Sequence, residues 1–260
     1  MDQPETIDDL VVLGRAAPEP LSDGRYTVCL GGYSETVGYV RLYPTTRGMT
    51  QCKRWNVVSV PVQDAAPEDT REESYKIAGE GESRKEALNK VEKVGRLSKS
   101  EQIQLVDDLA GDCTADLNDR RTSLGIAKPE EIAGFELDPT DSSTVQVTLD
   151  GKERKGKRDY PYKLYIDYRC EDCSLQSTYH HQHCIEWGVY QYWEKNEDLE
   201  KVVDALKLTD ERYEHYFFVG NLNHQRTSYI IISDLRFSHG DMLDAGVLVE
   251  GQSSISDYYP

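Results

Sequence analysis

The chain has 260 residues, of which 38% are hydrophobic and 30% charged, and its mean hydropathy is −0.66. This is enough apolar material for a hydrophobic core, so the composition excludes a wholly disordered chain. No stretch approaches 18 uncharged apolar residues, and the first residues are acidic. We therefore expect neither a membrane span nor a secretory signal, and we expect a cytoplasmic protein.

The charge balance is strongly acidic, because 47 Asp and Glu residues stand against 30 Lys and Arg and give a net charge of −17. The carboxylates are scattered through every segment rather than gathered in one tail. Scatter favours a halophilic protein, whose acidic surface keeps it hydrated in salt, over an acidic binding surface. High salt screens charge to within roughly 3 Å, so the net charge does not exclude a nucleic-acid partner.

The first third of the chain has the sequence pattern of β-strands. Short β-branched and aromatic runs, separated by Gly and Pro, occupy residues 10–13, 25–30, 36–43 and 55–62. This spacing is typical of a small barrel or sandwich. We expect an OB-like β-barrel domain over residues 1–80.

The middle third has a helical period and predicts a helical segment over residues 81–133. A capping box at 83–86 opens a helix that ends at Gly95, a second box at 98–101 opens a helix that ends at Gly111, and a third helix is expected over 114–124. These are ordinary amphipathic helices, and nothing catalytic is visible on them.

After residue 133 the pattern returns to strands. Strands are expected at 134–137, 144–149, 162–169, 216–219 and 229–233, and helices at 184–194 and 199–208. We expect a C-terminal mixed β/α unit over 134–239 and a flexible tail over 240–260. The fold class is therefore α+β, with strands before and after a helical middle.

The sharpest chemical signal follows the strand that ends at residue 169. A CxxC pair, Cys170 and Cys173, aims two thiolates at one point, and His and Cys residues follow it. If these start a helix, His180 shares a face with the residues three or four positions later. Two Cys with a His/Cys or His/His pair suit Zn²⁺. We predict one structural zinc ion per chain, held by Cys170, Cys173, His180 and Cys184, with His183 as the alternate for either of the last two.

The spacing C-x2-C-x6-H-x3-C is similar to that of the zinc knuckle, a family of small nucleic-acid-binding sites, but departs from that family's usual x4 and x4. Reduced core cysteines and a redox CxxC remain alternatives. The patterns of zinc deaminases, serine hydrolases, Walker A loops, dinucleotide-binding loops and restriction-type nucleases are absent from the sequence. We therefore predict no catalytic residues.

Two places concentrate cations in this acidic chain, and phosphate contacts need local cations. The first also carries aromatic residues on adjoining β-elements, and it comprises Arg41, Tyr43, Arg47, Lys53, Arg54 and Trp55. The second is a basic stretch, and it comprises Lys152, Arg154, Lys155, Lys157 and Arg158. An OB-like barrel uses such a face to stack bases and neutralise phosphates. Alternatively, the aromatic residues lie at the edge of the core and the cations pair with carboxylates.

Several short segments carry a family resemblance: GYVRLYP at 38–44, RWNVV at 54–58, DTREESYKI at 69–77, the region 180–187, and FFVG at 217–220. In these segments the chain resembles a prokaryotic protein family of haloarchaeal type. The resemblance implies OB-like β domains, a nucleic-acid context and, for some members, a position near genome-defence genes. It implies no reaction and no catalytic residues.

The sequence thus predicts a nucleic-acid-binding or adaptor protein, with DNA, RNA or other protein subunits as partners. One alternative is a zinc- or carboxylate-dependent enzyme acting on nucleic acid, and another is a protein-only scaffold. An adaptor's metal site would be closed by four protein ligands, whereas an enzyme's site would keep an open position in a cleft. Nothing in the sequence indicates an oligomeric state.

Overall fold

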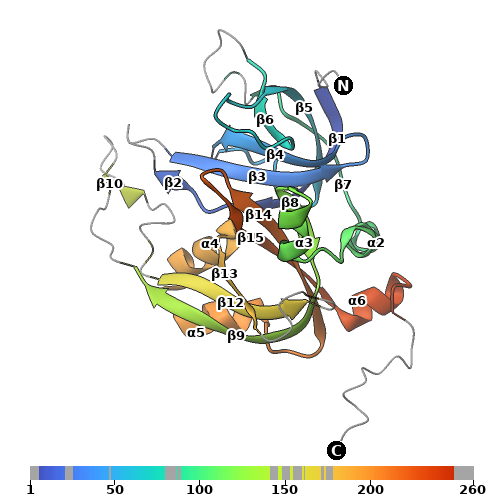
Figure 1. Ribbon diagram of the computed structural model, residues 1–260, viewed down its shortest axis with the longest axis vertical. Helices are drawn as coiled ribbons and strands as arrows, with labels where there is room; N and C mark the ends of the chain where they lie inside the picture. The colour runs from blue at the N-terminus through green and yellow to red at the C-terminus, as the bar shows by residue number, and fades with distance from the viewer. Residues whose placement is uncertain are drawn as a thin grey trace, which may run out of the picture.

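Two β-sheets pack against each other in the computed structural model of the protein, with short helices around their edges (Figure 1). The structure describes residues 6–20, 26–46, 48–79, 86, 89–140, 146–147, 153–154, 160, 162–170, 173 and 178–248. None of the helices in these ranges is long and apolar enough to cross a membrane.

The first sheet closes into a barrel at the N-terminal end of the chain. Its strands are β1 (Thr6–Arg15), β2 (Glu19–Pro20), β3 (Tyr26–Ser34), β4 (Gly38–Thr45), β5 (Asn56–Asp64), β6 (Ser74–Ile77) and β7 (Glu92–Arg96). Because β1 pairs with both β3 and β5, the strands β1-β3-β4-β6-β5 form a closed five-stranded barrel. The β4–β6 pair is parallel, and the other pairs are antiparallel. The predicted N-terminal β-barrel is confirmed.

The barrel interior follows from strict alternation along β5. Val58, Val60 and Val62 are buried, whereas the residues between them are only partly buried. Period-two alternation of this kind points one side of a strand into the core. The valines meet Leu10, Leu30 and other apolar side chains of β1, β3 and β4 in one continuous cluster.

The second sheet has the strand order β8-β14-β15-β13-β12-β9. Its strands are β8 (Leu124–Ala127), β9 (Pro129–Pro139), β12 (Tyr162–Cys170), β13 (His180–Cys184), β14 (Tyr213–Leu222) and β15 (Gln225–Ser238). The β13–β15 pair is parallel, and the others are antiparallel. The fold is therefore α+β with strands predominating, and the predicted α+β class is confirmed.

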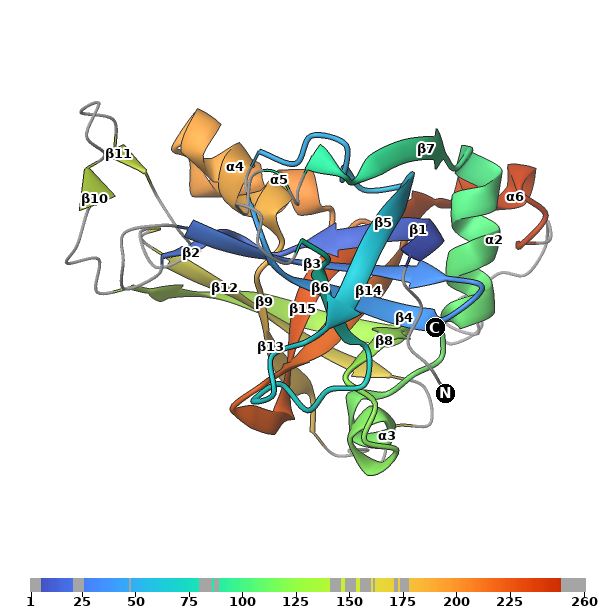
Figure 2. The same cartoon turned by 90° about the horizontal axis from the view of Figure 1, so that it is seen from above.

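Helices surround the two sheets, and α2 and α6 lie side by side at one end (Figures 1 and 2). Their bounds are α2 (Lys99–Leu109), α3 (Thr114–Asp119), α4 (Trp187–Asn196), α5 (Leu199–Leu206) and α6 (His239–Asp244). A small hairpin of β10 (Gln146–Val147) and β11 (Glu153–Arg154) lies apart from both sheets (Figure 2). The capping box predicted at the start of α2 is present, with Ser98 and Glu101 as its two members.

The middle of the chain is less helical than predicted. The prediction of a helix that ends at Gly95 is wrong for its last turn, because residues 92–96 form β7 and pair with β5. The helix expected over 114–124 ends at Asp119, and Leu124 opens β8 instead. In both places hydrogen bonds to a partner strand outweigh a weak local helix preference.

Two predictions near the C-terminus also need correction. The helix expected over 184–194 begins only at Trp187, because His180–Cys184 is strand β13, paired with β12. The flexible tail expected from residue 240 instead begins with α6, in which Met242 is buried. Residues 249–260 lie outside the described ranges.

One face of the barrel is covered by the second sheet. Phe218 of β14 is fully buried and packs against the barrel, where its ring stacks on Tyr39 with centroids 6.2 Å apart. The approach depends on glycine: a Cβ added at Gly31 would lie 2.5 Å from the Phe218 ring, and one at Gly14 would lie 2.8 Å from Ser233 Cβ. The two sheets therefore share one core, and this face of the barrel is not exposed.

Candidate metal centre

Strand β12 brings the first cysteine to the centre by simple alternation. Leu164, Ile166, Tyr168 and Cys170 are buried in turn, and the residues between them are partly exposed. Because a strand alternates its side chains between two faces, Cys170 continues the buried face of β12 at its last residue. The predicted strand over 162–169 is confirmed, and its period places the thiol inside.

Strand β13 places the histidine beside that thiol. Tyr168 is paired with His180 across the β12–β13 ladder, and their ring centroids are 5.0 Å apart. On β13 it is His180, Gln182 and Cys184 that are buried. His180 therefore points to the same buried side of the sheet as Cys170.

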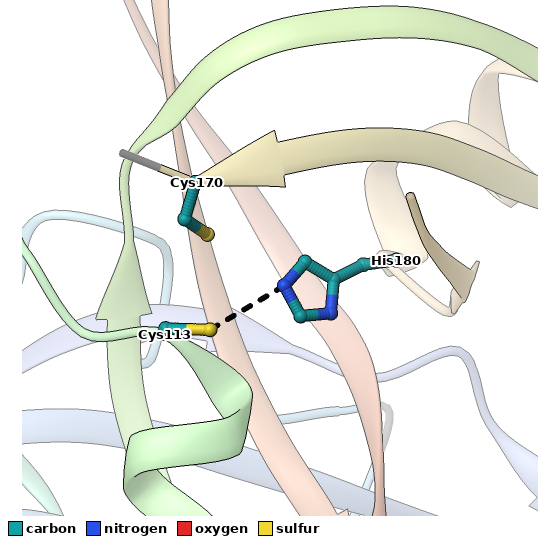
Figure 3. Close-up of side chains that lie close together, drawn as sticks. All are labelled: Cys113, Cys170 and His180. Carbon is teal, nitrogen blue, oxygen red and sulfur yellow. Dashed lines mark hydrogen bonds between the residues drawn. The ribbon is translucent and has the colours of Figure 1, made fainter. Parts of the chain in front are cut away.

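A third cysteine comes from far upstream in the chain. Cys113 immediately precedes α3, and Figure 3 shows it pointing toward His180 and Cys170. Its Sγ lies 3.4 Å from His180 Nε2 and 3.3 Å from the Sγ of Cys173. The Cys173 Sγ lies 3.2 Å from the same Nε2. Donor atoms of Cys113, Cys170 and His180 all lie within 4.8 Å of one another.

Donor atoms of Cys113, Cys170 and His180 thus form a buried cluster that can hold a metal ion, and the Cys173 Sγ lies beside two of them. The four side chains are Cys113, Cys170, Cys173 and His180, and none is more than 6% exposed. A tetrahedral zinc ion with Zn–S bonds of about 2.3 Å separates its sulfurs by about 3.8 Å. The 3.3 Å between Cys113 and Cys173 is a few tenths of an ångström shorter, so the donor set fits after a small outward shift.

The cluster favours a thiolate at Cys113. Its pKa is lowered to about 3, chiefly by a hydrogen bond from Cys170 and also by hydrogen bonds involving His180 and the backbone of Ala115. That same hydrogen bond, together with burial, raises the pKa of the Cys170 thiol. Metals bind thiolates, so the hydrogen bonding of the cluster favours the form of Cys113 that a metal ion needs.

A chain of hydrogen bonds fixes the orientation of the imidazole. His180 Nδ1 lies 3.2 Å from Thr114 Oγ1, the residue that follows Cys113. Gln182 Nε2 donates to the same Oγ1 at 3.3 Å, and the Tyr168 hydroxyl donates to Gln182 Oε1 at 2.9 Å. If Nδ1 carries the proton and donates it to Thr114, Nε2 is left with a free lone pair that faces the sulfurs.

Two of the predicted ligands lie elsewhere. Cys184 is fully buried in the apolar core, opposite Ile231 of β15, and His183 lies 3.1 Å from the Tyr190 hydroxyl. The prediction assumed a helix, where residues four apart are about 6 Å apart. In a strand, four residues span roughly 13 Å, so His180 and Cys184 cannot share one ion. The ligand that sequence reasoning missed, Cys113, gave no spacing signal because it lies 57 positions before Cys170.

A polar groove of about 380 Å³ adjoins the metal cluster. It lies between α3 on one side and strands β13 and β15 on the other. Its polar lining includes Thr114, Asn118, Gln182, Thr227, Ser228 and Tyr229.

The first predicted nucleic-acid face is largely inside the molecule. Arg41 is 4% exposed, and its guanidinium donates to the Ser123 carbonyl at 2.9 Å. Trp55 is 8% exposed and packs near Phe237 in the core shared with the second sheet. The Arg54 Nη1 donates to Glu186, to Ser233 and to the carbonyl of Asp234. The physical reason is that the second sheet covers this face, so Arg41 and Trp55 cannot meet an external ligand there.

The remaining predicted residues are either exposed or outside the described residues. Tyr43 is 37% exposed and Lys53 is exposed, whereas Arg47 lies outside the described residues. In the basic stretch, only the backbone of Arg154 in β11 is described. The side chains of Lys152, Arg154, Lys155, Lys157 and Arg158 lie outside what the structure describes.

Comparisons with known proteins find a similar sequence family and a similar solved structure. Residues 6–108, which span the barrel and nearly all of α2, match a family described as "Domain of unknown function (DUF8758)". No curated protein matches the chain. Among solved structures it is similar to a murine DNA-binding protein bound with double-stranded DNA, with 6% identity over 90% of this chain and 94% of that one. The TM-score of 0.33 is too low to carry an argument about fold or function.

Proposed function

We propose that the protein is a non-enzymatic nucleic-acid-binding adaptor whose Cys113, Cys170, Cys173 and His180 hold a structural zinc ion. The observation that carries the metal assignment is the buried cluster of Cys113, Cys170 and His180, with the Cys173 Sγ 3.3 Å from Cys113 Sγ and 3.2 Å from His180 Nε2 as the proposed fourth donor. Zinc favours tetrahedral sites of this composition, and structural sites use four protein ligands. The ion would tie α3 to the ends of β12 and β13.

The enzyme alternative needs an open coordination position beside a general acid or base. Here a fourth protein donor, Cys173, lies within 3.3 Å of both Cys113 Sγ and His180 Nε2. Among the described residues that line the adjoining groove, none is Asp or Glu. These observations favour a structural ion over a catalytic one.

For nucleic acid, the basic stretch Lys152–Arg158 is the better candidate surface. It places five cations within seven residues of a chain whose net charge is −17. The other candidate face of the OB-like barrel is occupied by the second sheet, and among its described residues Tyr43 and Lys53 are the exposed ones. Phosphate binding requires locally concentrated cations, and the basic stretch supplies them.

Binding to duplex DNA, single-stranded DNA and RNA over a salt series tests this proposal. If five phosphates are neutralised, the logarithm of the duplex affinity should fall with a slope of roughly −4.5 against the logarithm of salt. The double change Lys155→Glu and Lys157→Glu should weaken binding and reduce that slope by about 2. Lys53→Glu is the matched control on an exposed barrel residue. Absence of binding to every nucleic acid would reject the proposal in favour of a protein-only scaffold, and an equal loss in Lys53→Glu would reject the basic stretch as the binding surface.

The proposal extends to habitat and biological setting. The scattered carboxylates favour a halophilic protein in a salt-rich cytoplasm. A role in genome defence rests on the family resemblance alone. Neither is needed for the zinc site or for the basic stretch to act as proposed.

A further inference from the structure

The second sheet splits between β13 and β15. Among the described residues, their parallel ladder is limited to Cys184 opposite Ile231, followed by a hydrogen bond from Ile185 N to the Ile231 carbonyl at 2.8 Å. Continuing that register would place Gln182 opposite Tyr229. Gln182 and Tyr229 do not pair, and both line the groove of about 380 Å³.

Both walls of the split are strand edges. β13 is paired on its other side with β12, where Ile166 faces Gln182. β15 is paired on its other side with β14, where Asn221 faces Tyr229, but the register breaks there and the next paired residue of β15 is Gln225. Residues 226–228 therefore have no ladder partner in β14, although the Arg226 carbonyl accepts from the Asn221 side chain at 3.1 Å. Such edges offer main-chain donors and acceptors to an added strand.

Polar side chains of the groove also have bonding capacity to spare. Within the described part of the chain, the side chains of Asn118, Thr227 and Ser228 make no hydrogen bond. The three line the groove from α3 and from β15. Neutral amide and hydroxyl groups can each donate and accept, so they suit the backbone of a polypeptide.

The electrostatic surroundings favour a cationic occupant. Of the described residues that line the groove, none is Lys or Arg. Alternation along β13 places Tyr179 and His181 on the face of the sheet away from α3, and there Glu131 accepts from the Tyr179 hydroxyl at 2.9 Å and Asp167 lies 2.7 Å from His181 Nδ1. The two nearby cations are engaged elsewhere: Arg169 is paired with Glu131 and Glu130, and Arg226, which precedes Thr227, donates to Thr70 Oγ1. Phosphate groups would be repelled here, whereas lysine or arginine side chains would be attracted.

We propose that this groove binds an extended, positively charged peptide segment of a partner protein, which fills the split and hydrogen-bonds to the edges of β13 and β15. The open stretch covers about three residues of each strand, or roughly 10 Å at 3.3 Å per residue. Three or four residues of the segment would lie inside, with flanking Lys or Arg near Glu131 and Asp167. This site is separate from the proposed nucleic-acid surface, and it gives the adaptor a second partner.

A fluorescein-labelled octapeptide of alternating lysine and valine is the probe, with fluorescence anisotropy of the full-length protein as the readout. Its control is the same peptide N-methylated at the valines, which keeps the charge and removes main-chain donors. Binding should weaken roughly tenfold or more on methylation, because several hydrogen bonds are lost. Equal binding of both peptides would overturn the proposal, since it would indicate attraction by the overall negative charge alone.

A matched pair of variants locates the site on the protein. Thr227 is exposed, so Thr227→Arg and Thr227→Glu should both fold with unchanged thermal midpoints. The arginine variant should weaken peptide binding several-fold, and the glutamate variant should retain or strengthen it. Equal effects of the two variants would overturn the assignment. Displacement of the peptide by a single-stranded oligonucleotide that still binds the Lys155/Lys157 double variant would do so too, by assigning the groove to nucleic acid.

Discussion

Replacing Cys113 with serine separates the ligand set seen in the structure from the set that the sequence predicts. Serine removes the sulfur while nearly preserving volume at a residue that is 1% exposed. If losing one thiolate weakens zinc binding about a thousandfold, the stabilisation lost by mass action is about 4 kcal/mol. For a chain of this size, each kcal/mol shifts the thermal midpoint by about 2–4 °C. We therefore expect the midpoint to fall by roughly 8–16 °C.

Two controls make the result specific. Cys184→Ala removes a predicted ligand that is fully buried but lies away from the cluster. This variant should keep one zinc ion per chain. In excess chelator, the difference between the wild type and Cys113→Ser should largely disappear, because both are then metal-free. Elemental analysis and melting curves supply both readouts. Full zinc content in Cys113→Ser, with zinc lost from Cys184→Ala, would refute the reasoning.

Further predictions concern the outer hydrogen bonds, the packing and the charges. Thr114→Val removes the partner of His180 Nδ1 and should weaken zinc affinity about 10–100-fold in a chelator competition, while Ser should largely restore it. Gly31→Ala would place a Cβ 2.5 Å from the Phe218 ring and should cost about 1–3 kcal/mol in denaturant unfolding, whereas Gly134→Ala, with open space around it, should cost little. The pKa of Asp69 is lowered: burial opposes the shift, and hydrogen bonds from Arg71 outweigh it. The stability this pair contributes is present above the ordinary value of 3.8 and lost as the pH falls through the lower folded value, so wild type and Asp69→Asn should converge in stability in acid. The acidic excess predicts a thermal midpoint that rises from low salt to molar KCl, and a midpoint that falls would count against a halophilic protein.

The barrel could be predicted from the sequence because its signals are local. Alternation along β5 and Gly or Pro between the strands mark each strand without reference to its neighbours. The segment 92–96 shows the limit of such signals. Its strand character comes from pairing with β5, a contact that no local pattern reveals.

Part of the metal cluster could also be predicted from a local signal. Cys170, Cys173 and His180 lie within eleven residues, and their spacing alone indicated a metal site. Cys113 is brought to them only when β8 and β9 extend the second sheet and carry α3 beside β13. The burial of Trp55 likewise depends on the packing of the two sheets against each other. From the sequence alone, an aromatic residue next to two cations is therefore predicted to lie on the surface.

X-ray absorption at the zinc edge of the purified full-length protein tests the central claim most directly. A closed structural site predicts three sulfur atoms at about 2.3 Å and one nitrogen at about 2.0–2.1 Å, with no oxygen ligand. The same spectrum from Cys113→Ser should lose one sulfur. Two sulfurs with an oxygen or a second imidazole in the wild type would contradict the account, because the site would then be open or built from other residues.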